Sequence, residues 1–413
     1  MKRAIVLSGG GGKGAYQVGV WKALKKLHKK YDVVTGTSVG ALNGAYMVQK
    51  DYKKAIHTWE NIDYNTIFDE AGEIKQKKDI LNLYIKGMVI DKGMKPTHLE
   101  NLIHETVDEK KFRKSKVGYG LVTYNLSKME PECLKKEQIK EGKLCDYLLA
   151  SASCFPVFQK KQIEDQNYID GGYYDNVPFE LAQEFHVDEI IVVDLEAPGI
   201  KKKWNHANEK LIWIRPNNKL NSFLSFNANQ SKRNICLGYN DTMKIFHKLD
   251  GSHFTFKKNQ LHKNYRKRKE KISKIINHTF NFENQKKITL EKILSIEIFN
   301  ILLQNNDEKE QEKIFNEIVE YVGICFEVED SKIYSIASYH DALMKKISKD
   351  LIESNTKDKV KMLFYSKDRI LKMYFLLFQK SLKDKVNLCT TAILHPRDFL
   401  AATYLYTIKN GSL

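Results

Sequence analysis

The sequence predicts an α/β domain built on a mainly parallel sheet, followed by a mostly α-helical C-terminal domain. A strand, a glycine-rich loop and a helix follow one another over residues 3–27, and the same succession returns over residues 33–49. Beyond about residue 250, apolar residues keep a helical period within a strongly charged sequence. The chain of 413 residues also exceeds the roughly 250–300 residues at which a single core stops growing. We therefore expect one domain at 1–250 and a helical extension at 251–413, with a regulatory or membrane-docking role.

The first strand and its loop indicate a site for negative charge. Residues 3–7 are apolar and β-branched, which is typical of a strand buried in a parallel sheet. Apolar residues at helical spacing begin at Ala15. A glycine loop before a helix N-terminus lets a ligand approach closely and directs backbone N–H groups toward it. The loop consists of Gly9, Gly10, Gly11, Gly12, Lys13 and Gly14.

The second strand ends in a sequence typical of a nucleophile elbow. Val33 and Val34 lead into Gly36-Thr37-Ser38-Val39-Gly40, and a helix is expected from about residue 41. A G-x-S-x-G elbow places its serine on a tight turn between strand and helix, with small neighbours that permit the turn. Ser38 is therefore the candidate nucleophile, supported by Gly36 and Gly40.

Two nucleotide-binding alternatives compete for the first loop. Gly9, Gly11 and Gly14 match G-x-G-x-x-G, but a dinucleotide site needs an acidic residue at the end of the second strand. Asp32 stands at the beginning of that strand instead. A Walker A loop needs Ser or Thr after its lysine, and Lys13 is followed by Gly14. A purely structural turn remains open for either loop taken alone, whereas two such loops at strand ends favour a site.

Periodicity predicts the remaining elements of the first domain. Residues 51–112 carry helical periods and are where a cap over a lipid pocket would be inserted; Trp59 and Phe68 within them are interpreted as core. Further elements are strands at 117–124, 189–195 and 211–214, a helix at 145–151, and a final helix that residues 238–241 open or interrupt.

Asp170 is the candidate general base. It follows an apolar pair and precedes Gly171 and Gly172, so a tight turn holds its carboxylate at a strand end; such a turn alone is no evidence of catalysis. Because no histidine falls in any motif, Asp170 would have to take the Ser38 proton directly. A carboxylate with a pKa near ~4 is a poor base, so the site has to be partly desolvated.

This ordered set of motifs resembles the patatin-like phospholipase family over about residues 3–250, with support from the segment 151–158 around Pro156. The resemblance implies a three-layer α/β/α fold and lipid acyl hydrolysis by Ser38 and Asp170, without metal or cofactor. It further implies oxyanion donors at Gly10, Gly11 and Gly12, and it places Lys13 at the family's basic position, where its charge could steady the oxyanion or a lipid head. Ser8 departs from the Asp that many members carry before the glycines.

The implied substrate is a membrane lipid, cleaved by a phospholipase A or lysophospholipase type of reaction. Three alternatives remain open at this point: a neutral-lipid esterase, a signal-gated protein, and a binding protein that keeps the scaffold without activity. Intact Ser38 and Asp170 argue against the last one. The oligomeric state is not predicted.

The net charge of +17 is concentrated in the basic segment, residues 257–274, which holds nine Lys or Arg against one Glu. Leu261, Tyr265 and Ile272 are interleaved, which suits a helix lying on an anionic membrane. A solvated charged face is the alternative, and nucleic acid is not expected because no nucleic-acid-binding motif accompanies the charge. The basic residues are Lys257, Lys258, Lys263, Arg266, Lys267, Arg268, Lys269, Lys271 and Lys274.

The expected location is cytoplasmic, with peripheral membrane contact. Six cysteines without paired spacing suggest reduced thiols. The N-terminus offers too few apolar residues for a signal peptide, and no run reaches the ~20 apolar residues of a spanning helix.

Overall fold

The computed structural model describes residues 1–69, 93–204, 210–280, 296–304, 307–354, 365–378 and 382–409. The chain divides into two compact units, Met1–Phe246 and His247–Leu413, which are described separately. In the described part of the chain, no helix is both long and apolar enough to cross a bilayer. Part of the segment in which a cap was expected, residues 70–92, lies outside the described residues.

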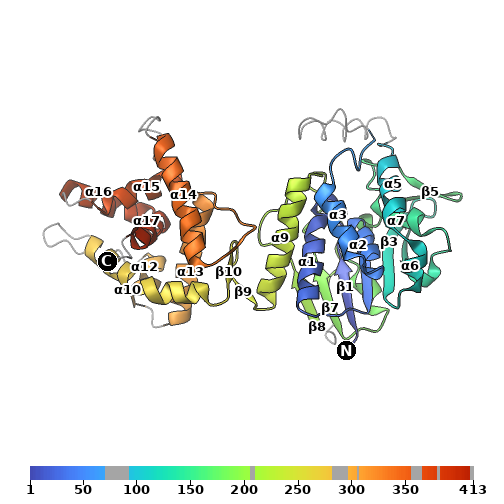
Figure 1. Cartoon of the computed structure of the whole chain (residues 1–413), viewed down its shortest axis with the longest axis horizontal. Helices are drawn as coiled ribbons and strands as arrows, with labels where there is room; N and C mark the ends of the chain where they lie inside the picture. Colours follow the sequence, from blue (N-terminus) through green and yellow to red (C-terminus); the bar gives the residue numbers. More distant parts are fainter. Residues whose placement is uncertain are drawn as a thin grey trace. The chain divides into compact units, whose positions relative to one another are not determined.

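A mainly parallel sheet forms the centre of the first unit (Figure 1). Its order over the described residues is β5-β6-β3-β2-β1-β7-β8, with β4 beside β3. Strands β3, β2, β1, β7 and β8 are parallel, whereas β4, β5 and β6 pair antiparallel with their neighbours. The strands are β1 Arg3–Leu7, β2 Val33–Thr37, β3 Gly118–Asn125, β4 Glu130–Lys135, β5 Lys161–Ile163, β6 Gln166–Asp170, β7 Glu189–Val193 and β8 Lys210–Ile214.

Helices cover both faces of this sheet, as the predicted three-layer fold requires. Successive side chains of a strand point to opposite faces. Accordingly, Ile5 and Leu7 of β1 belong to the core shared with α1, α2 and α7, while Ala4 and Val6 pack with α8. The helices of this unit are α1 Ala15–Lys26, α2 Val39–Val48, α3 Tyr52–Asn61, α5 Thr97–Thr106, α6 Glu109–Lys114, α7 Leu144–Ala152, α8 Phe179–Gln183 and α9 Ala228–Ile245.

Helix α9 corrects one sequence prediction. Gly238 was expected to open or interrupt a helix, but it lies inside α9. A Cβ atom at Gly238 would lie 2.0 Å from the Tyr16 carbonyl oxygen, and one at Gly19 would lie 2.0 Å from that of Ile235. The two glycines therefore let the backbones of α1 and α9 touch, and this contact between distant segments explains the glycine better than a helix end does.

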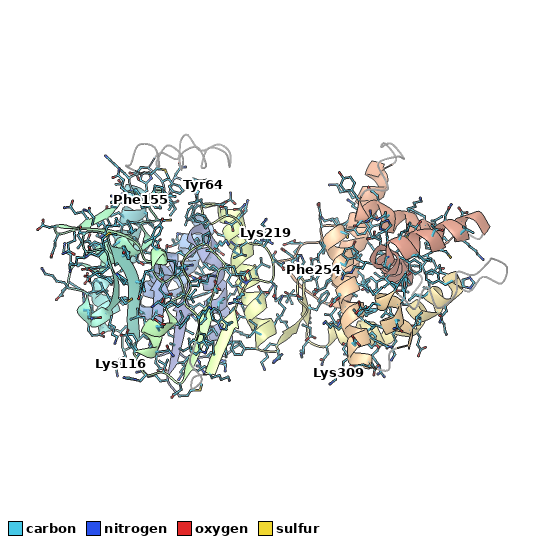
Figure 2. All side chains as sticks on the ribbon, turned by 180° about the vertical axis from the view of Figure 1, so that it is seen from behind. Tyr64, Lys116, Phe155, Lys219, Phe254 and Lys309 are labelled. Atoms are coloured by element: carbon cyan, nitrogen blue, oxygen red, sulfur yellow. The ribbon has the colours of Figure 1, made fainter. Side chains whose placement is uncertain are left out.

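The second unit is mostly helical, as predicted. Phe254, labelled in Figure 2, is fully buried in its core together with Phe256 and Tyr339. The helices are α10 Gln260–Phe280, α12 Glu297–Gln304, α13 Glu308–Cys325, α14 Ile336–Ser354, α15 Ser366–Leu376, α16 Leu382–Leu394 and α17 Pro396–Lys409. A small sheet joins β9 Leu249–Asp250, β10 Thr255–Lys257 and β11 Ile333–Tyr334.

The basic segment occupies the end of β10 and most of α10, and its apolar face is used inside this unit. Leu261, Tyr265 and Ile272 are 5%, 1% and 4% exposed and belong to the core. Arg268 is also buried, and its guanidinium donates to the Asn264 side chain. The prediction that the three apolar residues lie on a membrane is therefore wrong. Contact through charge alone stays a prediction, because six lysines are exposed: Lys257, Lys258, Lys263, Lys267, Lys271 and Lys274.

Candidate active site

Ser38 stands on the sharp turn between β2 and α2, where the sequence predicts an elbow. Its backbone has φ 56° and ψ −127°, a conformation that non-glycine residues rarely adopt and that often marks functional sites. Its N–H donates to Ser151 Oγ at 2.9 Å. A Cβ atom at Gly40 would lie 2.2 Å from the Leu7 carbonyl oxygen, so the turn closes only over a glycine. The predicted turn geometry is confirmed.

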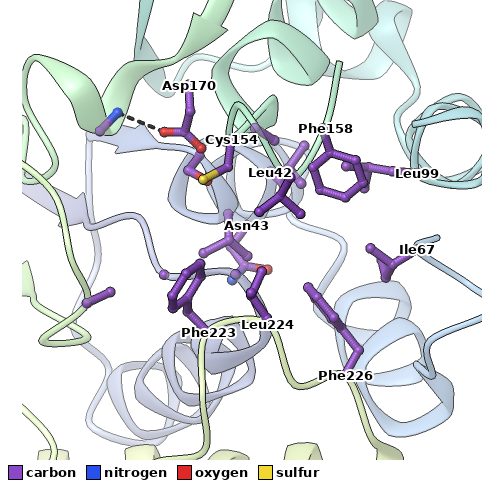
Figure 3. A pocket seen from close by; sticks show the side chains of 18 of the residues that line it. Leu42, Asn43, Ile67, Leu99, Cys154, Phe158, Asp170, Phe223, Leu224 and Phe226 are labelled. Atoms are coloured by element: carbon purple, nitrogen blue, oxygen red, sulfur yellow. Dashed lines mark hydrogen bonds between the residues drawn. The ribbon is translucent and has the colours of Figure 1, made fainter. Parts of the chain in front are cut away.

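Neighbouring strands bring Asp170 to Ser38. Thr37 pairs with Val122 between β2 and β3, and Thr123, the next residue of β3, pairs with Asp170 at the end of β6. The Asp170 carboxylate accepts the Gly172 N–H at 2.7 Å, the dashed line in Figure 3.

Burial also tunes the chemistry of this carboxylate. It raises the pKa of Asp170 to about 6, although side-chain hydrogen bonding with Ser38 and the bond from Gly172 act in the opposite direction. A carboxylate with this raised pKa is a better proton acceptor than an exposed one, and direct transfer of the Ser38 proton to Asp170 requires such a desolvated environment.

The glycine loop offers fewer donors than the sequence suggested. The Gly12 N–H donates to the Phe223 carbonyl at 2.7 Å, so it is already used inside the protein. Gly10 and Gly11 line the cavity beside Ser38 and stand at the start of a 3-10 turn, Gly11–Gly14, where N–H groups lack partners within the turn. The assignment of an oxyanion donor to Gly12 is therefore dropped.

Lys13 and the supporting glycines hold the loops in place. The Lys13 ammonium donates to the carbonyls of Leu195 and Glu196 at 3.2 and 3.1 Å, and burial lowers its pKa. It is not among the described residues that line the cavity, so its contacts indicate support of the loop instead of contact with substrate. A Cβ atom at any of four further motif glycines would come within 2.1–2.4 Å of a packed atom: Gly9, Gly14, Gly36 and Gly171.

Ser38 and Asp170 line an apolar cavity of about 490 Å³. Apolar side chains from α2, α5 and three loops surround it (Figure 3), among them Leu42, Ile67, Leu99, Phe158, Phe223 and Phe226. Trp59, interpreted from the sequence as core, is buried and also lines the cavity, whereas Phe68 is packed in the core. Among the described residues, no cluster of three or more His, Cys, Asp or Glu side chains is placed to hold a metal ion.

Two residues of the site escaped the sequence analysis. Ser151 accepts the Ser38 N–H and donates its own hydroxyl to the Val122 carbonyl at 2.7 Å. Asn176 lines the cavity at 2% exposure, and its Nδ2 atom has no hydrogen-bond partner among the residues that the structure describes. Its position six residues after Asp170 could have pointed to the site, but a single asparagine in a turn does not indicate a chemical role.

Together, the fold and the site define a three-layer α/β domain with an elbow serine and a buried aspartate beside a lipid-sized apolar cavity. Residues 5–182 match the family model described as patatin-like phospholipase. Over these residues the chain is similar to patatin-like phospholipases, and the match confirms the resemblance seen in the sequence.

Two named proteins and one solved structure are similar to this chain. Over 227 residues the chain is 25% identical to neuropathy target esterase sws of Drosophila melanogaster, covering 54% of this chain and 15% of that protein. Over 201 residues it is 25% identical to a cUMP-AMP-activated phospholipase of Escherichia coli, covering 43% of this chain and 56% of that protein. The crystal structure of VipD from Legionella pneumophila aligns over 98% of this chain and 89% of that one, with 16% identity and a TM-score of 0.39.

Proposed function

We propose that this protein is a lipid acyl hydrolase that cleaves carboxylic esters of membrane lipids. The observation that carries the proposal is the meeting of Ser38 with the buried Asp170 carboxylate at the wall of an apolar cavity. Both residues lie within the segment that matches the family model, and two relatives are named as an esterase and a phospholipase.

In the first half of the reaction, Ser38 Oγ attacks the ester carbonyl carbon while the ionised Asp170 carboxylate accepts the hydroxyl proton. The carbonyl oxygen becomes an oxyanion in a tetrahedral intermediate. When the intermediate collapses, the C–O bond to the alcohol breaks, and Asp170 returns the proton to the departing alkoxide. The product is an acyl ester of Ser38 and a free alcohol, such as a lysolipid.

In the second half, a water molecule takes the place of the alcohol. Asp170 accepts a proton from this water as it attacks the acyl carbon, and the proton then passes to Ser38 Oγ as the acyl bond breaks. The products are a free fatty acid and the regenerated serine. Because Asp170 must be ionised in both halves, we expect activity on a neutral ester to rise as the pH passes about 6.

The backbone N–H groups of Gly10 and Gly11 are the proposed oxyanion donors. Both residues line the cavity with Ser38, and the strained elbow presents the serine to the same space. A single donor of this kind contributes roughly 3–4 kcal/mol of transition-state stabilisation in other acyl-transfer enzymes. The loop therefore supplies a large part of the proposed catalysis.

Lipid mass spectrometry tests the proposal most broadly. Phosphatidylcholine vesicles, phosphatidylglycerol vesicles and a triacylglycerol emulsion are each incubated with wild type and with Ser38→Ala. We expect fatty acid and lysolipid from phospholipid with wild type only. Release from triacylglycerol alone would support a neutral-lipid esterase, and no release from any lipid would contradict lipid acyl hydrolysis.

A further inference from the structure

We propose that Tyr46 sets the length of the acyl chain that the cavity accepts, so that the protein prefers esters of medium-length acyl chains. This inference rests on the proposed acyl hydrolysis and adds a specificity-determining residue to it. It is based on the arm of the cavity that extends along α2 away from Ser38.

One face of α2 forms the floor of this arm of the cavity. Leu42 and Tyr46 line it four residues apart, one above the other along the helix, and Ser38 stands at the N-cap of this helix. Tyr46 lies eight positions after Ser38, and a rise of about 1.5 Å per residue makes this distance along the helix about 12 Å. A chain attached at Ser38 can therefore run roughly 12 Å before it meets the tyrosine.

Helices α3 and α5 form the sides of the arm. Trp59 of α3, Ile62 just beyond it, and Leu102 and Ile103 of α5 line the cavity with apolar surface. Thr58 and Thr106 add polar side chains to this lining. Gln49, just beyond α2, accepts the Asp108 N–H just beyond α5 at 2.7 Å, so the C-terminal ends of these two helices lie together.

Tyr46 closes the arm by linking its two sides. The Tyr46 hydroxyl lies 3.3 Å from Thr58 Oγ1 on α3 and is hydrogen-bonded to Thr106 on α5. The Thr106 hydroxyl itself donates to the Leu102 carbonyl. The tyrosine is 5% exposed. An acyl chain that reached further would have to displace a buried ring and leave these polar groups without partners, which is unfavourable.

The test is the rate profile over 4-nitrophenyl butyrate, octanoate, laurate and palmitate at equal concentration in the same detergent. Wild type is expected to cleave octanoate at least fivefold faster than palmitate. Tyr46→Leu opens the end of the arm and should move the optimum toward palmitate. Leu102→Trp fills the arm and should move it toward butyrate, so the proposal stays testable if one variant fails to fold. Met47→Leu is the matched control, because Met47 is the next residue of α2, is buried and is not among the described residues lining the cavity.

A profile that is the same in wild type, Tyr46→Leu and Leu102→Trp would overturn the proposal, as would an equal shift in Met47→Leu. These outcomes differ from failure of the proposed function. In that case, no ester of any length is cleaved above the level of Ser38→Ala, and all variants are inactive alike.

Discussion

The backbone N–H of Ser38 donates to Ser151 Oγ at 2.9 Å, and the same hydroxyl donates to the Val122 carbonyl at 2.7 Å. Ser151 therefore ties the strained elbow to strand β3, one residue before the one that pairs with Asp170. A single hydroxyl on α7 thus connects the turn that carries the candidate nucleophile to the strand that positions the candidate base.

Replacing Ser151 with alanine removes this connection and leaves the Ser38 N–H without its partner. An unsatisfied buried donor costs roughly 1–3 kcal/mol. We expect the kcat/KM for a soluble ester to fall at least tenfold and the Tm to fall by a few degrees. Ser153→Ala is the control, since Ser153 is buried nearby but donates to the Leu149 carbonyl within its own segment. Equal losses in both variants would contradict a specific role for Ser151.

Asp170→Asn should abolish activity but stabilise the protein at neutral pH. Burial raises the pKa of Asp170 from 3.8 to about 6, so the wild type has to bury a charge above that pH. The stability that a raised pKa contributes is fully present below the pKa of the unfolded state. It is lost as the pH rises through the pKa of the folded state. The gain of the variant should therefore grow from pH 4 to about pH 6 and then stay constant, at on the order of 1–3 kcal/mol.

Urea unfolding of both proteins at pH 4, 5, 6 and 8 checks this expectation. A difference between the variant and the wild type that does not change with pH would mean that Asp170 is not a desolvated carboxylate. Retained esterase activity in Asp170→Asn would exclude it as the base.

Gly11→Ala should impair both the loop and the activity. Gly11 has φ 49°, and a Cβ atom there would lie 2.2 Å from the Phe223 carbonyl oxygen, so the loop has to move. We expect a drop in kcat of at least a hundredfold and a lower Tm. Gly142→Ala is a matched control, because Gly142 also has a positive φ, 81°, but no atom of the described part of the chain lies within 4 Å of its added Cβ. A fully active Gly11→Ala would show that this loop does not hold the oxyanion.

Charge contact with a membrane is tested on one face of α10. Lys263, Lys267, Lys271 and Lys274 are exposed at helical spacing. Each Lys near an anionic surface contributes about 1 kcal/mol of attraction, which salt screens over a Debye length of about 8 Å. Changing all four to Gln should weaken sedimentation with phosphatidylserine vesicles at least tenfold and leave soluble-ester hydrolysis unchanged.

The control carries the same charge change elsewhere in the second unit: Lys309, Lys313, Lys345 and Lys346 changed to Gln. If both quadruple variants bind anionic vesicles as the wild type does at low salt, this face of α10 is a solvated surface and not a docking site.

Local spacing predicted the parts of this protein that depend on neighbouring residues. The turn at Ser38 and the strand end at Asp170 are fixed by the glycines beside them, so both were visible in the sequence. Contacts between distant segments were not visible. The Gly12 N–H is taken by Phe223, about two hundred residues away, and Gly238 marks a helix crossing instead of a helix end. In α10, periodicity indicated an apolar face, but it could not tell whether that face packs against lipid or against the protein's own core.

The central claim, that Ser38 is an acyl-accepting nucleophile activated by Asp170, is tested most directly by intact-protein mass spectrometry after incubation with a long-chain alkyl fluorophosphonate. Peptide mapping should place one adduct on Ser38 in the wild type and find none in Ser38→Ala. In Asp170→Asn, the adduct should form much more slowly than in the wild type. Labelling of Ser38→Ala at the wild-type rate, or a wild-type adduct on any residue other than Ser38, would contradict the claim.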